Sequence, residues 1–295
     1  MRPFREHRAG RLPALTDRLP LGARGLEVSP ICLGIVGEPG AVVEAFDAGI
    51  NFFFVTADMH WPVYESLRRG LTALFARGGG VRDEVVVASA SYVTQPEFCS
   101  IPFREVLDAV PGLDRIDMPV AGGAYAHDFL PRYRVYEGHL ARGRFGARAI
   151  GTTLHERRAA PTLGARLVDW AAVRYNTAHR GAEVDVFPFV GPDLPALLYA
   201  FKTTFGALPP SRLEALGLEP DHWRPHVTDY YRYALSAPQL DGLLCAFERP
   251  AHVRELADAL ARGPLSDDER QYLVDLADLA AGSAVLNAPP AAAEA

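Results

Sequence analysis

Short runs rich in β-branched and aromatic residues alternate with amphipathic stretches along most of the chain, from Leu21 onward. This alternation is typical of βα units that build a parallel sheet. Eight strands are predicted, at Ile31–Leu33, Asn51–Val55, Glu84–Ala90, Arg115–Val120, Ala147–Thr152, Trp170–Tyr175, Leu197–Phe201 and Gly242–Cys245. Eight strands separated by helices in a chain of 295 residues fit one closed (β/α)8 barrel better than an open doubly wound sheet.

The helices between these strands are readable as well. A helix is predicted over Val63–Phe75 from its 3.6-residue apolar period, and a second over Pro250–Ala261. The sequence Ser266-Asp-Asp-Glu269 is a capping box that predicts a last helix through Leu279. We therefore expect an N-terminal extension over 1–18, a barrel over 19–281, and a low-complexity, disordered tail over 282–295.

Composition narrows the class of protein. Hydrophobic residues make up 49% and charged residues 22%, as in a soluble globular protein. The net charge of -6 gives no electrostatic reason to expect nucleic acid. No apolar run reaches the roughly 20 residues that span a bilayer. Cys32 and Cys245 lie in apolar runs and are expected to be small buried hydrophobes, so a cytoplasmic location is expected.

One segment points to an ancestry. Gly49-Ile-Asn-Phe-Phe-Phe-Val-Thr-Ala-Asp-Met-His60 resembles the strand of the aldo-keto reductases that reads Gly-Ile-Asn-Phe-Phe-Asp-Thr-Ala-Asp-x-Tyr-Gly. Segments Arg174–Glu183 and Thr228–Ser236 are similar to one bacterial subgroup of that family, and Leu21–Val28 resembles the hairpin that plugs its barrel floor. The resemblance covers roughly Leu19 to Leu279 and implies a TIM barrel of aldo-keto reductase type.

The same resemblance implies that the family's chemistry is altered. The family reduces carbonyls with a tetrad of Asp, Tyr, Lys and His, and the aligned residues here are Val55, His60, Ala90 and Gly122. Reduction needs a proton donor beside the reacting oxygen, and losing a general acid typically costs about 10²–10⁴-fold. A classical NADPH-dependent carbonyl reductase is therefore not expected.

The resemblance also bears on the cofactor. Family members hold the nicotinamide carboxamide through a Ser-Asn pair and a Gln, where this chain has Thr153, Leu154 and Ala172. An acidic residue, Glu248, follows the eighth strand near the expected 2′-phosphate position. No cofactor is predicted, although NADPH binding stays an alternative.

Polar side chains remain at the strand ends, where barrel active sites lie. The predicted site residues are His60, Asp58, His155, Arg174, His179 and Lys202. Each has a second interpretation: Asp58 as a helix cap, His60 as a shape-determining or hydrogen-bonded side chain, and His155 and the Arg174–Glu183 block as loop-bracing groups. Asp58 and His60 with His155 or His179 would also offer metal ligands, but their spacing is no metal signature and no metal is predicted.

Two classes of function follow from these residues. The first is an enzyme of altered, non-redox chemistry on a small molecule or modified peptide, with His60 as acid or base and with Arg174 and Lys202 holding an anionic or carbonyl group. The second is a non-catalytic pseudoenzyme that binds a partner protein. A divergent NADPH-dependent oxidoreductase is a third hypothesis, and neither nucleic acid nor membrane is an expected partner.

Overall fold

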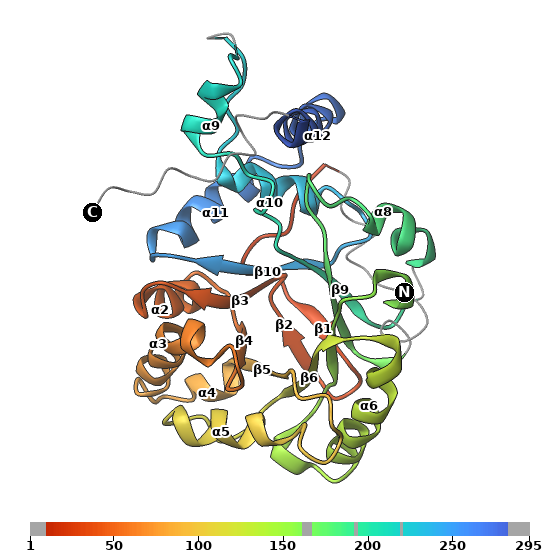
Figure 1. Cartoon of the computed structure of the whole chain (residues 1–295). Helices are drawn as coiled ribbons and strands as arrows, with labels where there is room; N and C mark the ends of the chain where they lie inside the picture. The colour runs from red at the N-terminus through yellow and green to blue at the C-terminus, as the bar shows by residue number, and fades with distance from the viewer. Residues whose placement is uncertain (1–9, 161–166, 192–193, 219–220, 283–295) are drawn as a thin grey trace, which may run out of the picture.

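A computed structural model describes residues 10–160, 167–191, 194–218 and 221–282. Eight parallel strands close into a barrel in the order β10-β3-β4-β5-β6-β7-β8-β9 (Figure 1). They are β3 Ile31–Val36, β4 Phe52–Thr56, β5 Val86–Ser91, β6 Met118–Ala124, β7 Gly151–Leu154, β8 Trp170–Arg174, β9 Leu197–Phe201 and β10 Gly242–Phe247. All eight predicted strands and the (β/α)8 class are thereby confirmed.

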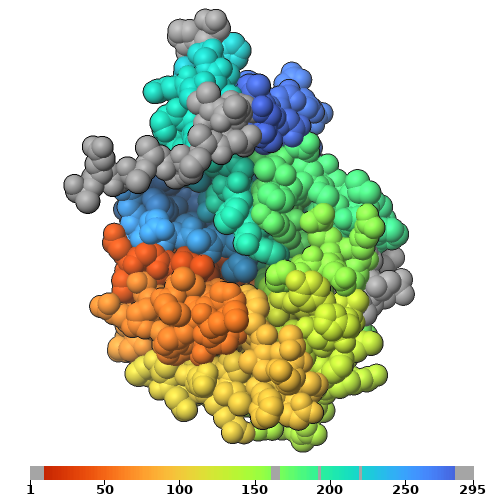
Figure 2. Space-filling view, in the orientation of Figure 1, coloured from red at the N-terminus to blue at the C-terminus, as the bar shows by residue number. Residues whose placement is uncertain are grey.

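Helices surround the barrel, and several are short. The α-helices are α2 Gly40–Asp47, α3 Glu65–Phe75, α4 Val81–Glu84, α5 Ile101–Ala109, α6 Ala126–Ala141, α8 Ala182–Asp185, α9 Pro210–Ala215, α10 Val227–Leu235, α11 Ala251–Ala261 and α12 Asp267–Gly282. Within the described residues, four 3-10 turns join them: η1 Trp61–Tyr64, η2 Arg144–Gly146, η3 Arg157–Ala159 and η5 Phe187–Phe189. Helices α9 and α12 project beyond the barrel (Figure 2).

The predicted helices match these elements with small shifts at their starts. The first turn of the helix expected at Val63–Phe75 is the 3-10 turn η1, because Pro62 lies near its start. The capping box before α12 is present: the Ser266 amide donates to Glu269 at 2.7 Å, and the Glu269 amide donates to the Ser266 hydroxyl at 3.2 Å. None of the helices in the described part of the chain is long and apolar enough to cross a membrane.

A two-stranded hairpin precedes the barrel, as predicted. Its strands β1 Leu19–Leu21 and β2 Leu26–Val28 pair antiparallel and lie across the centre of the strand ring in Figure 1. The buried Asn51 side chain joins hairpin and barrel: it accepts from the Ser29 amide at 2.7 Å and donates to the Glu27 carbonyl at 2.9 Å. Such a buried polar group stabilises only because it is hydrogen-bonded.

The segments outside the barrel are described in part. Leu12 and Leu15, within the predicted N-terminal extension, are each 5% exposed and belong to the core. Residues 1–9, and the predicted tail beyond Gly282, lie outside the described residues. The domain boundaries stay predictions.

Large aromatic side chains fill the barrel. Trp170 of β8 packs edge-on against Phe52 of β4, with ring centroids 6.0 Å apart, and also contacts Phe54 at 6.2 Å. Strands β4 and β8 are opposite one another in the closed barrel, so these contacts cross its interior. Tyr199 of β9 completes the cluster, at 5.9 Å from Phe52. The interior is a packed core, as in other barrels of eight strands.

Candidate active site

The loop after β4 carries the two predicted site residues that the structure brings into direct contact. The Nδ1 atom of His60 lies 3.2 Å from Oδ1 of Asp58. The Asp58 side chain is 8% exposed, whereas that of His60 is 44% exposed. A shielded carboxylate therefore orients an imidazole that solvent and a small molecule can reach. Asp58 also accepts from the backbone amide of His60, at 3.2 Å, and so stabilises this turn.

Tyr92, in the loop after β5, joins this pair. Its backbone amide donates to Oδ2 of Asp58 at 2.7 Å, and its ring centroid lies 4.4 Å from that of His60. Burial, with the charge of Asp58, raises the pKa of the Tyr92 phenol to about 12, and hydrogen bonding to the Thr153 side chain and the charge of Arg132 oppose that rise. Asp58 thus holds both rings, one through a side chain and one through the backbone.

Two glycines at the end of β6 make room for the Tyr92 ring. A Cβ on Gly122 would lie 3.0 Å from two ring carbons of Tyr92, and one on Gly123 would lie 3.1 Å from another. Gly123 has φ +60°, a conformation that strongly favours glycine. Its amide donates to the Thr153 hydroxyl of β7 at 2.8 Å. Any side chain at these two positions would displace the phenol.

Arg132 of α6 fixes the backbone on both sides of Tyr92. Its side chain is completely buried, and its guanidinium donates to the Ser91 carbonyl and, at 2.9 Å, to the Gly122 carbonyl. Asp128, four residues earlier on the same helix, lies 3.5 Å from it. A buried guanidinium is costly unless it is paired. Its pairing here ties the ends of β5 and β6 together beneath the site.

A second, cationic group lies at the ends of β8 and β9. Arg174 and Lys202 both lie over the ring of Phe205, at 5.9 Å and 5.2 Å from its centroid. Neither forms an ion pair within the described residues, and the buried Nε of Arg174 has no hydrogen-bond partner there. Lys202 has φ 56°, a left-handed conformation that costs a residue with a side chain roughly 1–2 kcal/mol.

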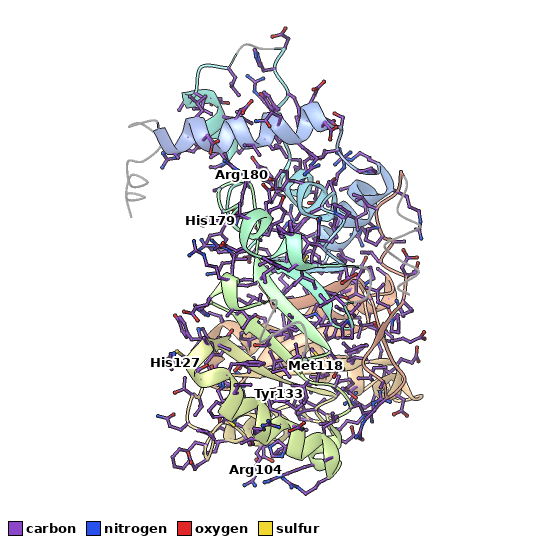
Figure 3. The ribbon with its side chains drawn as sticks, turned by 90° about the vertical axis from the view of Figure 1, so that its right-hand side faces the viewer. Arg104, Met118, His127, Tyr133, His179 and Arg180 are labelled. Carbon is purple, nitrogen blue, oxygen red and sulfur yellow. The ribbon has the colours of Figure 1, made fainter. Side chains whose placement is uncertain are left out.

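His179 belongs to this cationic group. Asn176 joins it to Lys202: the Asn176 amide donates to the Lys202 carbonyl at 2.7 Å, and its Oδ1 lies 3.3 Å from Nδ1 of His179. Burial, and then the charges of Arg174, Arg157 and Lys202, lower the pKa of His179. Figure 3 shows His179 beside α8 and His127 at the start of α6, along one edge of the molecule. A region with unpaired cations and a neutral imidazole is suited to a small anion.

His155 lies close to the first group: a Cβ on Gly123 would be 2.9 Å from its Cε1 and 3.1 Å from Cδ1 of Tyr92. His155 is exposed and its ring packs 5.2 Å from that of Tyr125. Trp223 packs against Tyr272 of α12 at 5.8 Å. No three His, Cys, Asp or Glu side chains in the described ranges come close enough to hold a metal ion. Cys99 is fully buried, and burial raises the pKa of its thiol.

The strand register identifies which residues face the barrel interior. Because Phe52 and Phe54 contact Trp170 across the barrel, alternation turns Val55 toward the surrounding helices. Thr56 pairs with Ala90, so Ala90 faces inward, and Ala90 in turn pairs with Val120, two residues before Gly122. Phe54 and Thr56, and not Val55, are therefore the inward-facing residues at this end of β4.

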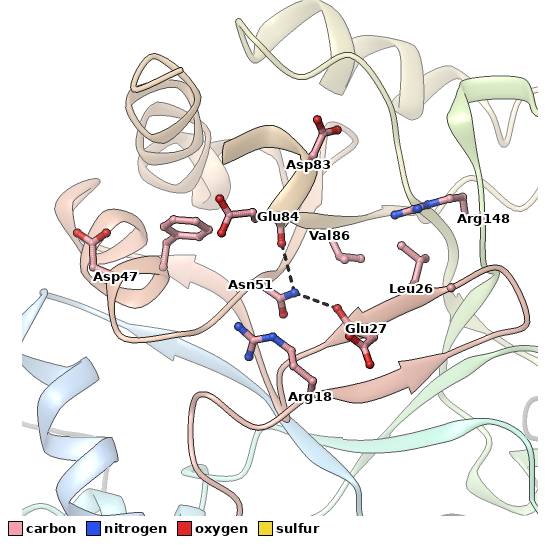
Figure 4. A pocket seen from close by; sticks show the side chains of 11 residues that line it. Arg18, Leu26, Glu27, Asp47, Asn51, Asp83, Glu84, Val86 and Arg148 are labelled. Atoms are coloured by element: carbon pink, nitrogen blue, oxygen red, sulfur yellow. Dashed lines mark hydrogen bonds between the residues drawn. The ribbon is translucent and has the colours of Figure 1, made fainter. Parts of the chain in front are cut away.

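A cavity of about 550 Å³ lies at the opposite end of the barrel, under the hairpin (Figure 4). Its lining is polar, and the Asn51 side chain that bridges Glu27 and Glu84 crosses it. Asp47 and Asp83 at its edge are paired with Arg77 and Arg115. The Asn51 hydrogen bonds join the hairpin to the barrel floor, and the two ion pairs join neighbouring segments beside them. We therefore assign this cavity a structural role.

Comparison with known proteins places the fold. The chain matches no protein-family model and no curated protein. Among solved structures, an aldo-keto reductase from Bacillus halodurans in its holo form is similar with a TM-score of 0.68 and 16% identity, over 88% of this chain and 96% of that one. A thermostable aldo-keto reductase in complex with the inhibitor epalrestat is similar with a TM-score of 0.65 and 16% identity, over 88% of this chain and 99% of that one.

A third similar structure, described as an aldo-keto reductase from Pseudomonas aeruginosa, gives a TM-score of 0.61 and 19% identity, over 85% of this chain and 97% of that one. The fold is therefore the (β/α)8 barrel of the aldo-keto reductases, as the sequence motifs predicted. At these identities the likeness defines the fold alone, because one barrel supports many chemistries.

Proposed function

We propose that this chain is a divergent member of the aldo-keto reductase family that catalyses proton transfer on a small anionic carbonyl compound, without a nicotinamide cofactor. The observation that carries the proposal is the accessible His60 imidazole held at 3.2 Å by the shielded Asp58 carboxylate. An imidazole oriented by a carboxylate is a common general acid or base in enzymes.

The residues at the cofactor positions of the family do not fit a nicotinamide dinucleotide. Leu154 and Ala172 are apolar and buried, and the Thr153 hydroxyl already accepts from the Gly123 amide. Glu248 would add a negative charge beside a 2′-phosphate. The strand-end positions that would complete a reductase tetrad hold Phe54 or Val55, Ala90 and Gly122, none with a titratable side chain. These residues support a reaction without hydride transfer.

The proposed roles follow from the positions. His60 removes a proton from the carbon next to the substrate carbonyl and returns it to the same or the neighbouring carbon, while Asp58 keeps the imidazole oriented and stabilises its charged form. Arg174 and Lys202 bind the anionic group of the substrate, since both are cations without a carboxylate partner among the described residues. The reaction class is isomerisation or enolisation, and it consumes no cofactor.

A deuterium-exchange experiment tests this function. The protein is incubated in D2O, without nucleotide, with pyruvate, 2-oxobutyrate and dihydroxyacetone phosphate, and loss of the C–H signals is followed by proton NMR. We expect catalysed exchange of at least one probe, lowered about 10²-fold or more by His60→Gln. His222→Gln is the matched control, because His222 is similarly exposed and lies 3.6 Å from an exposed Asp221. Equal exchange by the parent and His60→Gln, or none by the parent, would contradict the proposal.

A non-catalytic role is the second candidate, favoured by exposed apolar side chains on the loops around the barrel mouth. Met59 is 82% exposed, and Val63, Phe98 and Tyr125 are 49%, 54% and 41% exposed. Exposed apolar groups that gather in one region are typical of a binding surface. A folded parent protein that exchanges no probe, together with unchanged stability of Met59→Ser and Phe98→Ser, would favour this partner-binding role.

A further inference from the structure

Tyr92 has an environment that simple packing does not require. Its ring lies against the bare backbone of Gly122 and Gly123, and its amide is held by Asp58 at 2.7 Å. Its ring also faces the accessible imidazole of His60. The phenol is therefore fixed from several sides, in contact with the residue to which the proposed function assigns proton transfer.

The hydrogen bonding of Thr153 bears on the direction in which the Tyr92 hydroxyl proton points. The Thr153 oxygen accepts from the Gly123 amide at 2.8 Å, so its own hydroxyl proton remains available to donate. The Thr153 side chain lies close enough to the Tyr92 phenol to lower its pKa. When Thr153 donates to the Tyr92 oxygen, the phenol proton points away from Thr153 and remains available to an oxygen of the substrate.

We propose that Tyr92 is a second catalytic residue of this site, which donates its phenol proton to the carbonyl oxygen of the substrate while His60 takes the proton from carbon. Thr153 is the positioning residue that orients this phenol. The inference rests on the proposed function, and it identifies the substrate atom that Tyr92 recognises: an oxygen that gains negative charge during the reaction.

The proposed step conserves protons and electrons. The C–H bond breaks and its proton goes to the His60 imidazole, while the electron pair forms a carbon–carbon double bond. The Tyr92 O–H bond breaks and its proton passes to the carbonyl oxygen, leaving an enol and a tyrosinate. In the return step the enol gives its oxygen-bound proton back to Tyr92, and His60 returns its proton to carbon. A hydroxyl donor to the Tyr92 oxygen, Thr153, stabilises the tyrosinate in between.

The activity test uses Tyr92→Phe in the exchange assay. We expect a fall in kcat of about 10²-fold or more with little change in KM, because Phe keeps the ring and removes only the proton. Parent-like exchange by Tyr92→Phe, with exchange lost in His60→Gln, would overturn the inference and leave the proposed function intact. Absence of exchange in the parent would instead contradict the proposed function.

A second measurement examines the relay without any substrate. Protein labelled with ¹³Cζ-tyrosine gives an NMR signal from each labelled tyrosine. The signal that disappears in Tyr92→Phe belongs to Tyr92. We expect Thr153→Val to shift that signal, and Thr153→Ser, which keeps the hydroxyl, to leave it near its parent position. We also expect Thr153→Val to lower kcat and Thr153→Ser to keep kcat near the parent value. An unshifted signal in Thr153→Val would contradict the relay whatever the activity.

Discussion

The rings of His60 and Tyr92 face one another with centroids 4.4 Å apart and planes tilted by 48°. They come from loops after neighbouring strands, β4 and β5, and Asp58 hydrogen-bonds to both residues. Two groups able to carry a proton are thus held by one carboxylate. This relationship distinguishes the barrel mouth from one that is merely packed with aromatic side chains.

The fit of Tyr92 against Gly123 predicts a specific cost for a methyl group. A Cβ at Gly123 would lie 2.9 Å from Cε1 of His155 and 3.1 Å from Cδ1 of Tyr92. Gly79 has a similar φ, +64°, with nothing within 4 Å, so Gly79→Ala carries only the backbone strain. We expect urea unfolding to show Gly123→Ala less stable than Gly79→Ala by about 1–3 kcal/mol, through overpacking. Equal losses would show that the two rings move aside freely.

The buried His139 predicts a pH dependence of stability. Burial, and then the charges of Arg144, Arg142 and Arg104, lower the pKa of His139 to about 4. An unfolded histidine titrates near 6.5, so between these values the unfolded chain binds the extra proton. The stability from this residue is present above pH 6.5 and is lost as the pH falls toward 4.

Unfolding in urea at pH 7.5, 6 and 5 measures this effect. Over this range the loss is at most about 2 kcal/mol, at about 1.4 kcal/mol for each pH unit below 6.5. His139→Gln should flatten the pH dependence between pH 7 and 5, and the exposed His222→Gln should not. A parent-like pH dependence in His139→Gln would show that other groups cause it.

The cysteines predict the reactivity of the native protein toward a thiol reagent. Cys32, Cys99 and Cys245 are buried and unpaired, and burial raises the pKa of each thiol. A thiolate that is both disfavoured and shielded reacts slowly. We expect Ellman's reagent to label no thiol rapidly in the native protein and all three in guanidinium chloride. Rapid native labelling would show that one of these regions opens.

Much of the fold could be predicted from the sequence because the strands are short apolar runs and amphipathic helices separate several of them. The boundaries were less predictable where charge replaces hydrophobicity. The strand expected at Arg115–Val120 begins at Met118, because Arg115 and Asp117 form ion pairs ahead of it. Sequence reasoning also gave Val55 as the counterpart of the family's Asp, whereas the alternation of β4 turns Phe54 inward. An offset of one residue reverses the face of every side chain in a strand.

The site itself was predictable only in part. Asp58 and His60 are two residues apart, so their contact is local and the motif pointed to it. Tyr92 was not among the predicted site residues, because its place depends on contacts between distant segments: with Asp58, with two glycines, and with Thr153. Arg132 was missed. The signal available for it was Asp128 four residues earlier, which is the spacing of a helical ion pair.

One NMR measurement tests the central claim most directly: the protein is mixed in D2O with both NADPH and a 2-oxo acid, and the fates of the two are followed together. We predict that deuterium replaces the hydrogens on the carbon beside the carbonyl, that this exchange needs His60, and that NADPH stays unchanged. Formation of the 2-hydroxy acid with matching oxidation of NADPH would contradict the account, because the barrel would then transfer hydride.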